Sequence, residues 1–195
     1  MRKMYAVQFK RKRRRVTNYR KRLKLIVSGR HRLVVRKSLK YITAQIVEYS
    51  PDGDKVVASA HSKELKKHGW LYSGGNLCAS YLTGLLLGKK ISKIKINDAI
   101  LDIGLNPSVK GSRIYALLKG VIDSGVKLSA PQEIFPSQER ISGKHIADYA
   151  EKIKGNDAAY KKQFSKYIKN NLEPGDIPKN LEAVKKRILQ NGKES

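Results

Sequence analysis

The pattern of hydrophobic and polar positions divides the chain into three parts. Residues 1–30 carry little apolar surface, and a regular apolar pattern begins at Leu33. β-branched, aromatic and other apolar residues then gather in three runs, at 32–37, 41–49 and 55–60. Pro51 and Gly53 lie between the second and third runs, where a turn needs a fixed or positive φ. Three short runs with short connections predict an antiparallel β-meander.

The hydrophobic period changes after residue 60. The pattern predicts a short polar helix over 62–68, apolar helices over 76–90 and 112–124, and a strand over 93–103. This order of strands and helices predicts helices that cover a mixed sheet. Beyond Pro131 the pattern predicts three polar helices, at about 142–154, 157–170 and 178–190. Their low apolar content indicates that they wrap the core or meet a neighbour.

The predicted fold class is therefore α/β. We expect a three-layer mixed β-sheet flanked by helices, with a basic extended N-terminal arm and a helical C-terminal extension. The expected boundaries are 1–30 for the arm, 31–130 for the α/β core domain and 131–195 for the extension.

The charge of the chain points to a polyanionic partner. Its 42 Lys and Arg residues against 16 Asp and Glu residues give a net charge of +26. Residues 1–40 contain 17 of these cations and no acid. Like charges at this density repel one another, and the phosphates of a polyanion would supply the missing counter-charge. We expect residues 1–30 to be disordered until RNA binds, although a solvated tail, a nuclear-import signal or a membrane-surface patch would share this composition.

No membrane association or disulfide is expected. No stretch approaches the roughly 18–20 apolar residues of a membrane span, and the first 30 residues lack an apolar signal-peptide core. The single cysteine, Cys78, lies in an apolar stretch, where it is expected to be buried as a small hydrophobe. These features predict a soluble intracellular protein.

Candidate catalytic and metal-binding residues are few. His31, His61, His68 and His145 lack metal-ligand spacing, so no metal or cofactor is predicted. Gly74-Gly75 before a helix could expose N–H groups to a phosphate, although an ordinary helix start explains it as well. Asp98, Asp102 and Asp123 could belong to a metal-dependent nuclease. No nearby Glu or His completes such a site, and the chain is not predicted to be an enzyme.

Several segments, in order along the chain, carry a family resemblance. They are Arg11–Arg15, Thr17–Tyr19, Arg22-Leu23, Arg32–Ser38, Gln45, Ala58–Ser62, Gly69-Trp70, Gly75-Asn76, Ala79–Leu86, Leu101–Leu105, Gly111–Arg113, Lys119-Gly120, Asp123–Gly125, Gly143, His145–Ala147 and Tyr149. Together they resemble the archaeal and eukaryotic type of large-subunit ribosomal protein eighteen, a family that binds 5S ribosomal RNA.

The resemblance implies a structural component of the large ribosomal subunit, in the cytoplasm. This component would bind 5S ribosomal RNA and help attach it to the subunit as part of the central protuberance. The implied partners are 5S ribosomal RNA, large-subunit ribosomal RNA, large-subunit ribosomal protein five and other central protuberance proteins. It implies no catalytic role for the three aspartates.

The candidate RNA-binding residues lie in the arm and at the start of the core. They are Lys10, Arg11, Lys12, Arg13, Arg14, Arg15, Tyr19, Arg20, Lys21, Arg22, Lys24, Arg30, Arg32, Arg36, Lys37 and His61. The cations suit phosphates, which they neutralise with release of counterions. Among the aromatics Tyr5, Phe9 and Tyr19, we single out Tyr19 as a candidate to stack on an unpaired base, while packing back onto the domain remains an equal alternative.

Overall fold

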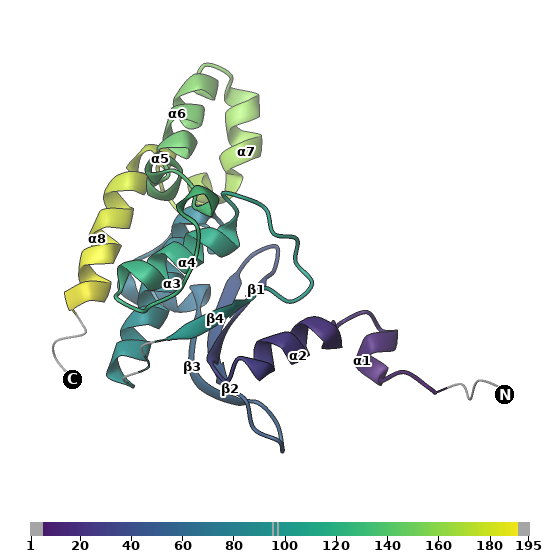
Figure 1. The fold of residues 1–195 in the computed structure, drawn as a ribbon. Coiled ribbons are helices and arrows are strands. Elements are labelled where there is room, and N and C mark those ends of the chain that lie inside the picture. Colours follow the sequence, from purple (N-terminus) through teal and green to yellow (C-terminus); the bar gives the residue numbers. More distant parts are fainter. Residues whose placement is uncertain (1–5, 95, 97, 191–195) are drawn as a thin grey trace.

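A four-stranded mixed sheet lies at the centre of the computed structural model, which describes residues 6–94, 96 and 98–190. Its strands are β1 (His31–Lys37), β2 (Ile42–Glu48), β3 (Lys55–His61) and β4 (Ala99–Asp102). They are ordered β3-β2-β1-β4, with β1 antiparallel to β2, β2 antiparallel to β3, and β4 parallel to β1 (Figure 1). The predicted meander and the predicted mixed sheet are therefore both confirmed.

The fourth strand is shorter than the predicted run of 93–103. The preceding helix, α3 (Leu77–Lys93), continues to Lys93 because Ile91 extends its buried face. β4 then pairs with β1 only along Ala99–Asp102. Residues 95 and 97 of the predicted run lie outside the described residues.

Helix α3 and helix α4 (Arg113–Asp123) cover one face of the sheet, which we call the core face. Two glycines let them approach backbone to backbone. A Cβ on Gly84 would lie 2.1 Å from the carbonyl oxygen of Leu117, and one on Gly120 would lie 2.2 Å from that of Tyr81. Any side chain at these positions would push the helices apart.

The N-terminal turn of α3 is buried beneath this layer. Asn76 caps the helix by accepting a hydrogen bond of 2.8 Å from the N–H of Ala79. Cys78 is fully buried, and this burial raises the pKa of its thiol to about 12. The structure thus confirms that Cys78 behaves as a small hydrophobe. The predicted helix at 62–68 is the 3-10 helix η1 (Ser62–His68), which ends at Gly69 with φ +90°.

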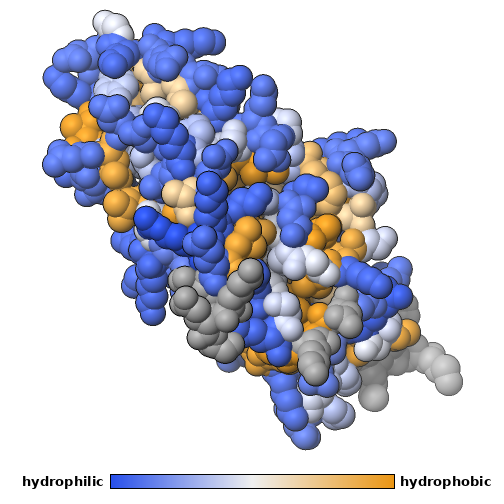
Figure 2. Space-filling view, turned by 90° about the vertical axis from the view of Figure 1, so that its left-hand side faces the viewer, coloured by the Kyte–Doolittle hydropathy of each residue, from blue (hydrophilic) through white to orange (hydrophobic). Residues whose placement is uncertain are grey.

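The C-terminal part is helical, as predicted. It contains η2 (Gln132–Ile134), α5 (Gln138–Ser142), α6 (Lys144–Ile153), α7 (Asp157–Lys169), η3 (Pro174–Asp176) and α8 (Ile177–Gln190). Leu181, Val184 and Ile188 of α8 belong to the same hydrophobic core as α3. Figure 2 views the molecule from the α8 side, where hydrophilic residues cover most of the surface and hydrophobic ones form small separate patches.

The N-terminal part contains two helices, α1 (Lys10–Arg13) and α2 (Tyr19–Val27). Neither helix was predicted from the sequence, which indicated an arm that is disordered until RNA binds. Helix α2 begins at Asn18, whose side chain accepts a hydrogen bond of 3.1 Å from the N–H of Lys21. Its Leu25 and Ile26 are half-buried against the molecule. Tyr5 lies outside the described residues. No helix within the described residues is long and apolar enough to span a membrane.

Candidate nucleic-acid interface

The second face of the sheet, which we call the outer face, is opposite α3 and α4 and carries polar side chains. Its pairs follow from the strand register: Arg36 lies opposite Thr43, Val34 opposite Gln45, and Arg32 opposite Val47. Because side chains alternate along a strand, these residues face away from Leu33 and Val35 of the core. Ser59 and His61 continue this face onto β3.

Helix α2 lies beside the outer face, α1 continues away from the sheet, and both helices carry cations (Figure 1). Nine of the predicted RNA-binding residues are exposed in or next to these helices: Lys10, Arg11, Lys12, Arg13, Arg14, Arg15, Arg20, Lys21 and Lys24. We call these nine the arm cations. Arg15 has a left-handed backbone with φ +52°, which turns the chain between the helices. Arg30 and Lys37 are exposed at the two ends of β1, and Arg30 forms an ion pair of 3.3 Å with Asp98.

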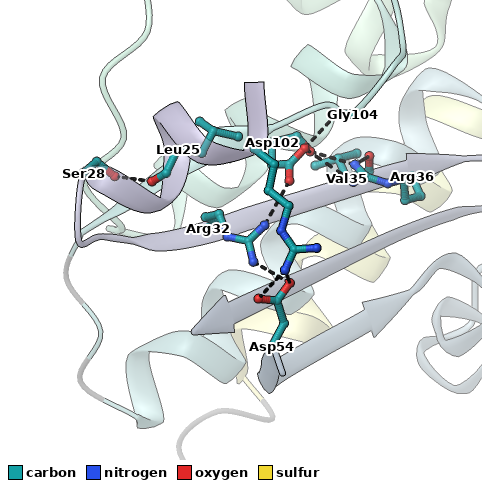
Figure 3. Close-up of polar contacts among 9 residues, drawn as sticks. Leu25, Ser28, Arg32, Val35, Arg36, Asp54, Asp102 and Gly104 are labelled. Carbon is teal, nitrogen blue, oxygen red and sulfur yellow. Dashed lines mark hydrogen bonds and ion pairs between the residues drawn. The ribbon is translucent and has the colours of Figure 1, made fainter. Parts of the chain in front are cut away.

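Two aspartates and three predicted RNA-binding arginines form a network under α2. One guanidinium nitrogen of Arg22 donates to both carboxylate oxygens of Asp54, at 3.1 Å each. Arg32 lies between Asp54 and Asp102, as Figure 3 shows, at 2.6 Å and 3.4 Å. Arg36 donates to the backbone carbonyl of Asp102 at 2.9 Å, and Asp102 also accepts the N–H of Gly104 at 2.8 Å. The network ties α2, β1 and β4 together.

This network changes the roles available to Arg32 and Arg36. Arg32 is 4% exposed and both of its carboxylate partners are in place, so it does not face solvent where a phosphate could reach it. Sequence reasoning placed Arg32 among the phosphate contacts because the chain alone does not reveal its partners. Arg36 is half-exposed and packs against Gly104, where an added Cβ would lie 3.0 Å from its guanidinium carbon.

Tyr19 and His61 occupy different surroundings. The ring of Tyr19 is half-buried against the ring of Phe9, with centroids 5.3 Å apart, so it packs within the arm. His61 caps η1, because its Nδ1 accepts a hydrogen bond of 3.0 Å from the N–H of Lys63. Its ring also lies 5.2 Å from that of Tyr41. The structure thus gives His61 a local structural role at the edge of the outer face.

The three suspected aspartates do not converge on a catalytic site. Asp98 pairs with Arg30, and Asp102 belongs to the network under α2. Asp123 pairs with Lys119 at 3.2 Å and accepts a hydrogen bond of 2.9 Å from the hydroxyl of Tyr81. Burial and this carboxylate raise the pKa of Tyr81. Within the described part of the chain, no three His, Cys, Asp or Glu residues gather to hold a metal.

The Gly74-Gly75 segment forms a tight helix start. The N–H of Gly75 is directed to the hydroxyl of Ser73 at 3.4 Å, and a Cβ on Gly75 would lie 2.9 Å from the carbonyl oxygen of Leu39. Glycine is needed here because the loop before β2 passes close by. This close approach accounts for a glycine at position 75 as part of an ordinary helix start, so no bound phosphate is needed to explain it.

A cleft of about 790 Å³ separates α2 from the outer face. Residues between Arg11 and Leu25, most of them on or next to α2, form one side. The outer face forms the floor, and Leu101–Pro107, from the end of β4 onward, form the other side. Sequence reasoning missed this segment and Gln45 as possible contacts. Both stood out only as parts of the family pattern, since nothing local indicates that they lie opposite the arm.

Comparisons with known proteins agree on one family. The family described as "Ribosomal large subunit proteins 60S L5, and 50S L18" matches residues 3–98. The chain is also 48% identical over 185 residues to the large ribosomal subunit protein uL18 of Methanococcus maripaludis. That alignment covers 95% of this chain and 96% of the relative. The matching proteins are structural ribosomal components and not enzymes. The chain therefore belongs to the archaeal and eukaryotic type of the uL18 family of large ribosomal subunit proteins.

Proposed function

We propose that this ribosomal protein binds 5S ribosomal RNA and helps attach it to the large subunit. It would do so within the central protuberance, beside large-subunit ribosomal protein five. The observation that carries the proposal is the position of the arm cations. All nine are exposed, and three of them, Arg11, Lys21 and Lys24, line the cleft over the polar sheet face, beside which the contact between Arg22 and Asp54 holds α2.

The two parts of this interface would perform different tasks. The arm cations and Lys37 would neutralise phosphates and release counterions, which supplies affinity for any RNA. Preference for one RNA needs a rigid surface that fits its shape and its unpaired nucleotides, because the deep major groove of an RNA helix hides base edges. The outer face supplies that surface. In this proposal, Arg22, Arg32 and Arg36 hold α2 over the sheet, so that the helix and the outer face bind RNA as one unit.

The test compares two RNAs of similar length at physiological salt. The purified chain should bind 5S ribosomal RNA at least tenfold more tightly than a transfer RNA, which carries a similar density of phosphates. A difference of that size corresponds to about 1.4 kcal/mol of binding free energy. Equal affinities would contradict the proposal, because charge alone would then account for binding.

Attachment to the subunit needs a second measurement. Large subunits depleted of 5S RNA, this protein and protein five should regain 5S RNA when all three are returned. Omission of this protein should leave most of the 5S RNA unbound in a sedimentation assay. Full recovery without the protein would show that it has no part in attachment.

A further inference from the structure

The cleft under α2 has a size and a lining that phosphate binding alone does not require. Its volume of about 790 Å³ lies within the range of roughly 300–1,000 Å³ that is typical of small-ligand pockets. This volume is too small for an RNA double helix, yet it is large enough for a single nucleotide. Three arm cations, Arg11, Lys21 and Lys24, line the cleft, so RNA bound to them would lie against it.

The walls of the cleft are largely apolar. Val16, Val56 and Leu105 are each more than 50% exposed there, although large hydrophobic side chains are usually buried. Further apolar lining comes from Leu25, Val34, Val47, Leu101, Ile103 and Pro107. Such walls fit the flat face of a nucleobase, which gains free energy by leaving water.

A polar side chain, that of Gln45, lies on the floor of the cleft. Gln45 is half-buried on β2, directly opposite Val34 in the sheet. Among the residues that the structure describes, its side-chain amide has no hydrogen-bond partner. A carboxamide both donates and accepts, so it matches the mixed donor and acceptor edge of a base.

The charge around the cleft favours an anion. Six cationic side chains line it, Arg11, Lys21, Arg22, Lys24, Arg32 and Arg36, against the carboxylates of Asp54 and Asp102. Both carboxylates are already paired with arginines of the network. Lys21 and Lys24 have no ion-pair partner in the described part of the chain. These two lysines and Arg11 are exposed residues in the lining of the cleft, so they can meet a phosphate.

We propose that the cleft binds one unpaired nucleotide of the bound RNA. Its base lies between the apolar walls with its edge against Gln45, and its phosphate lies at Arg11, Lys21 and Lys24. The proposal rests on the proposed function. RNA is favoured over a peptide because a second hollow continues the cationic surface. That hollow shares Thr17, Asn18 and Leu105 with the cleft and adds Lys12, Arg15, Tyr19 and Arg20.

Two substitutions in the full-length chain test this site without touching the core. Val56→Trp fills the cleft from an exposed position, and Gln45→Leu removes the amide at nearly constant volume. The matched controls are Ile168→Trp and Gln163→Leu, two exposed positions on α7. Circular dichroism and thermal unfolding check that each variant keeps its fold. Affinity for 5S RNA is then measured from low to high salt, with transfer RNA as the reference.

Each cleft variant should lose about tenfold in affinity for 5S RNA, the effect expected for one buried hydrogen bond or one base contact. For Gln45→Leu the slope of log affinity against log salt should stay unchanged, because this variant leaves the cations at the phosphate in place. The controls should bind like the unmodified chain. If both folded cleft variants also bind like the unmodified chain, the cleft does not bind a nucleotide and the proposal is overturned. A peptide found in the cleft would not change that conclusion. If the unmodified chain shows no preference for 5S RNA, the proposed function fails instead.

Discussion

Arg22 of α2 and Asp54, just before β3, are joined by two hydrogen bonds of 3.1 Å, and this pair ties the arm to the sheet. Asp54 also holds the buried Arg32 at 2.6 Å. One carboxylate thus stabilises the position of the helix and neutralises a cation that is almost completely buried. The orientation of the arm cations depends on this residue.

Replacement Asp54→Asn should loosen α2 and destabilise the fold. Arg32 would lose one of its two carboxylates, which should lower the free energy of unfolding by about 1–2 kcal/mol. Urea unfolding measures this loss, and hydrogen exchange of the α2 amides should become faster. Asp52→Asn is the matched control, because Asp52 is exposed in the same turn. Equal stability of the two variants would contradict the anchoring role of Asp54.

Deletion of residues 1–16 should separate affinity from stability. Residues 6–16 are all exposed, so the melting temperature should hardly change. The deletion removes eight cations. If roughly half of them touch phosphates, the slope of log affinity against log salt should fall by about 3. The triple change Lys162→Gln, Lys166→Gln, Lys169→Gln on α7 controls for loss of charge elsewhere. An unchanged slope after the deletion would place the phosphate contacts outside α1.

The close packing of α3 on α4 predicts a severe effect of one methyl group. Gly84→Ala would bring a Cβ to 2.1 Å from the carbonyl oxygen of Leu117, so the helices must separate. The free energy of unfolding should fall by roughly 3 kcal/mol, as in other overpacked cores. Gly155→Ala, with open space around the added Cβ, should change it little. Chemical denaturation of both variants provides the comparison, and a stable Gly84→Ala protein would contradict the observed packing.

The pH dependence of stability should include a contribution from His68. Burial lowers the pKa of its imidazole below the ordinary 6.5; Glu64 opposes this, whereas Lys90 and Lys67 lower the pKa further. The unfolded chain therefore binds a proton first as pH falls. Stability should decrease from about pH 6.5 down to the folded pKa, and level off below it.

His68→Gln should remove this decrease, whereas His145→Gln should not, because His145 is exposed. Unfolding curves between pH 5 and 8, together with an NMR titration of the four histidines, measure the effect. A titration midpoint of His68 at or above the ordinary 6.5 would contradict the assigned burial.

The local pattern of the chain was sufficient to predict most of the fold. Runs of β-branched, aromatic and other apolar residues identified β1 and β2, and helical spacing identified α4, because each signal depends on neighbours within a few residues. The same local view failed at α2, where the density of Lys and Arg concealed a capped helix. The sequence contains the capping residue Asn18 and the apolar Leu25. Only the tertiary structure shows that Leu25 is half-buried where α2 lies over the sheet.

The sequence by itself determined that the protein is basic, that its cations gather at one end and that it resembles a ribosomal family. Only the tertiary structure decided which of those cations are free. Arg13 and Arg32 look alike along the chain, yet Arg13 is exposed whereas Arg32 lies between two carboxylates, one of them 70 positions away. The availability of a charge depends on burial and on ion-pair partners, and both are set by contacts between distant segments.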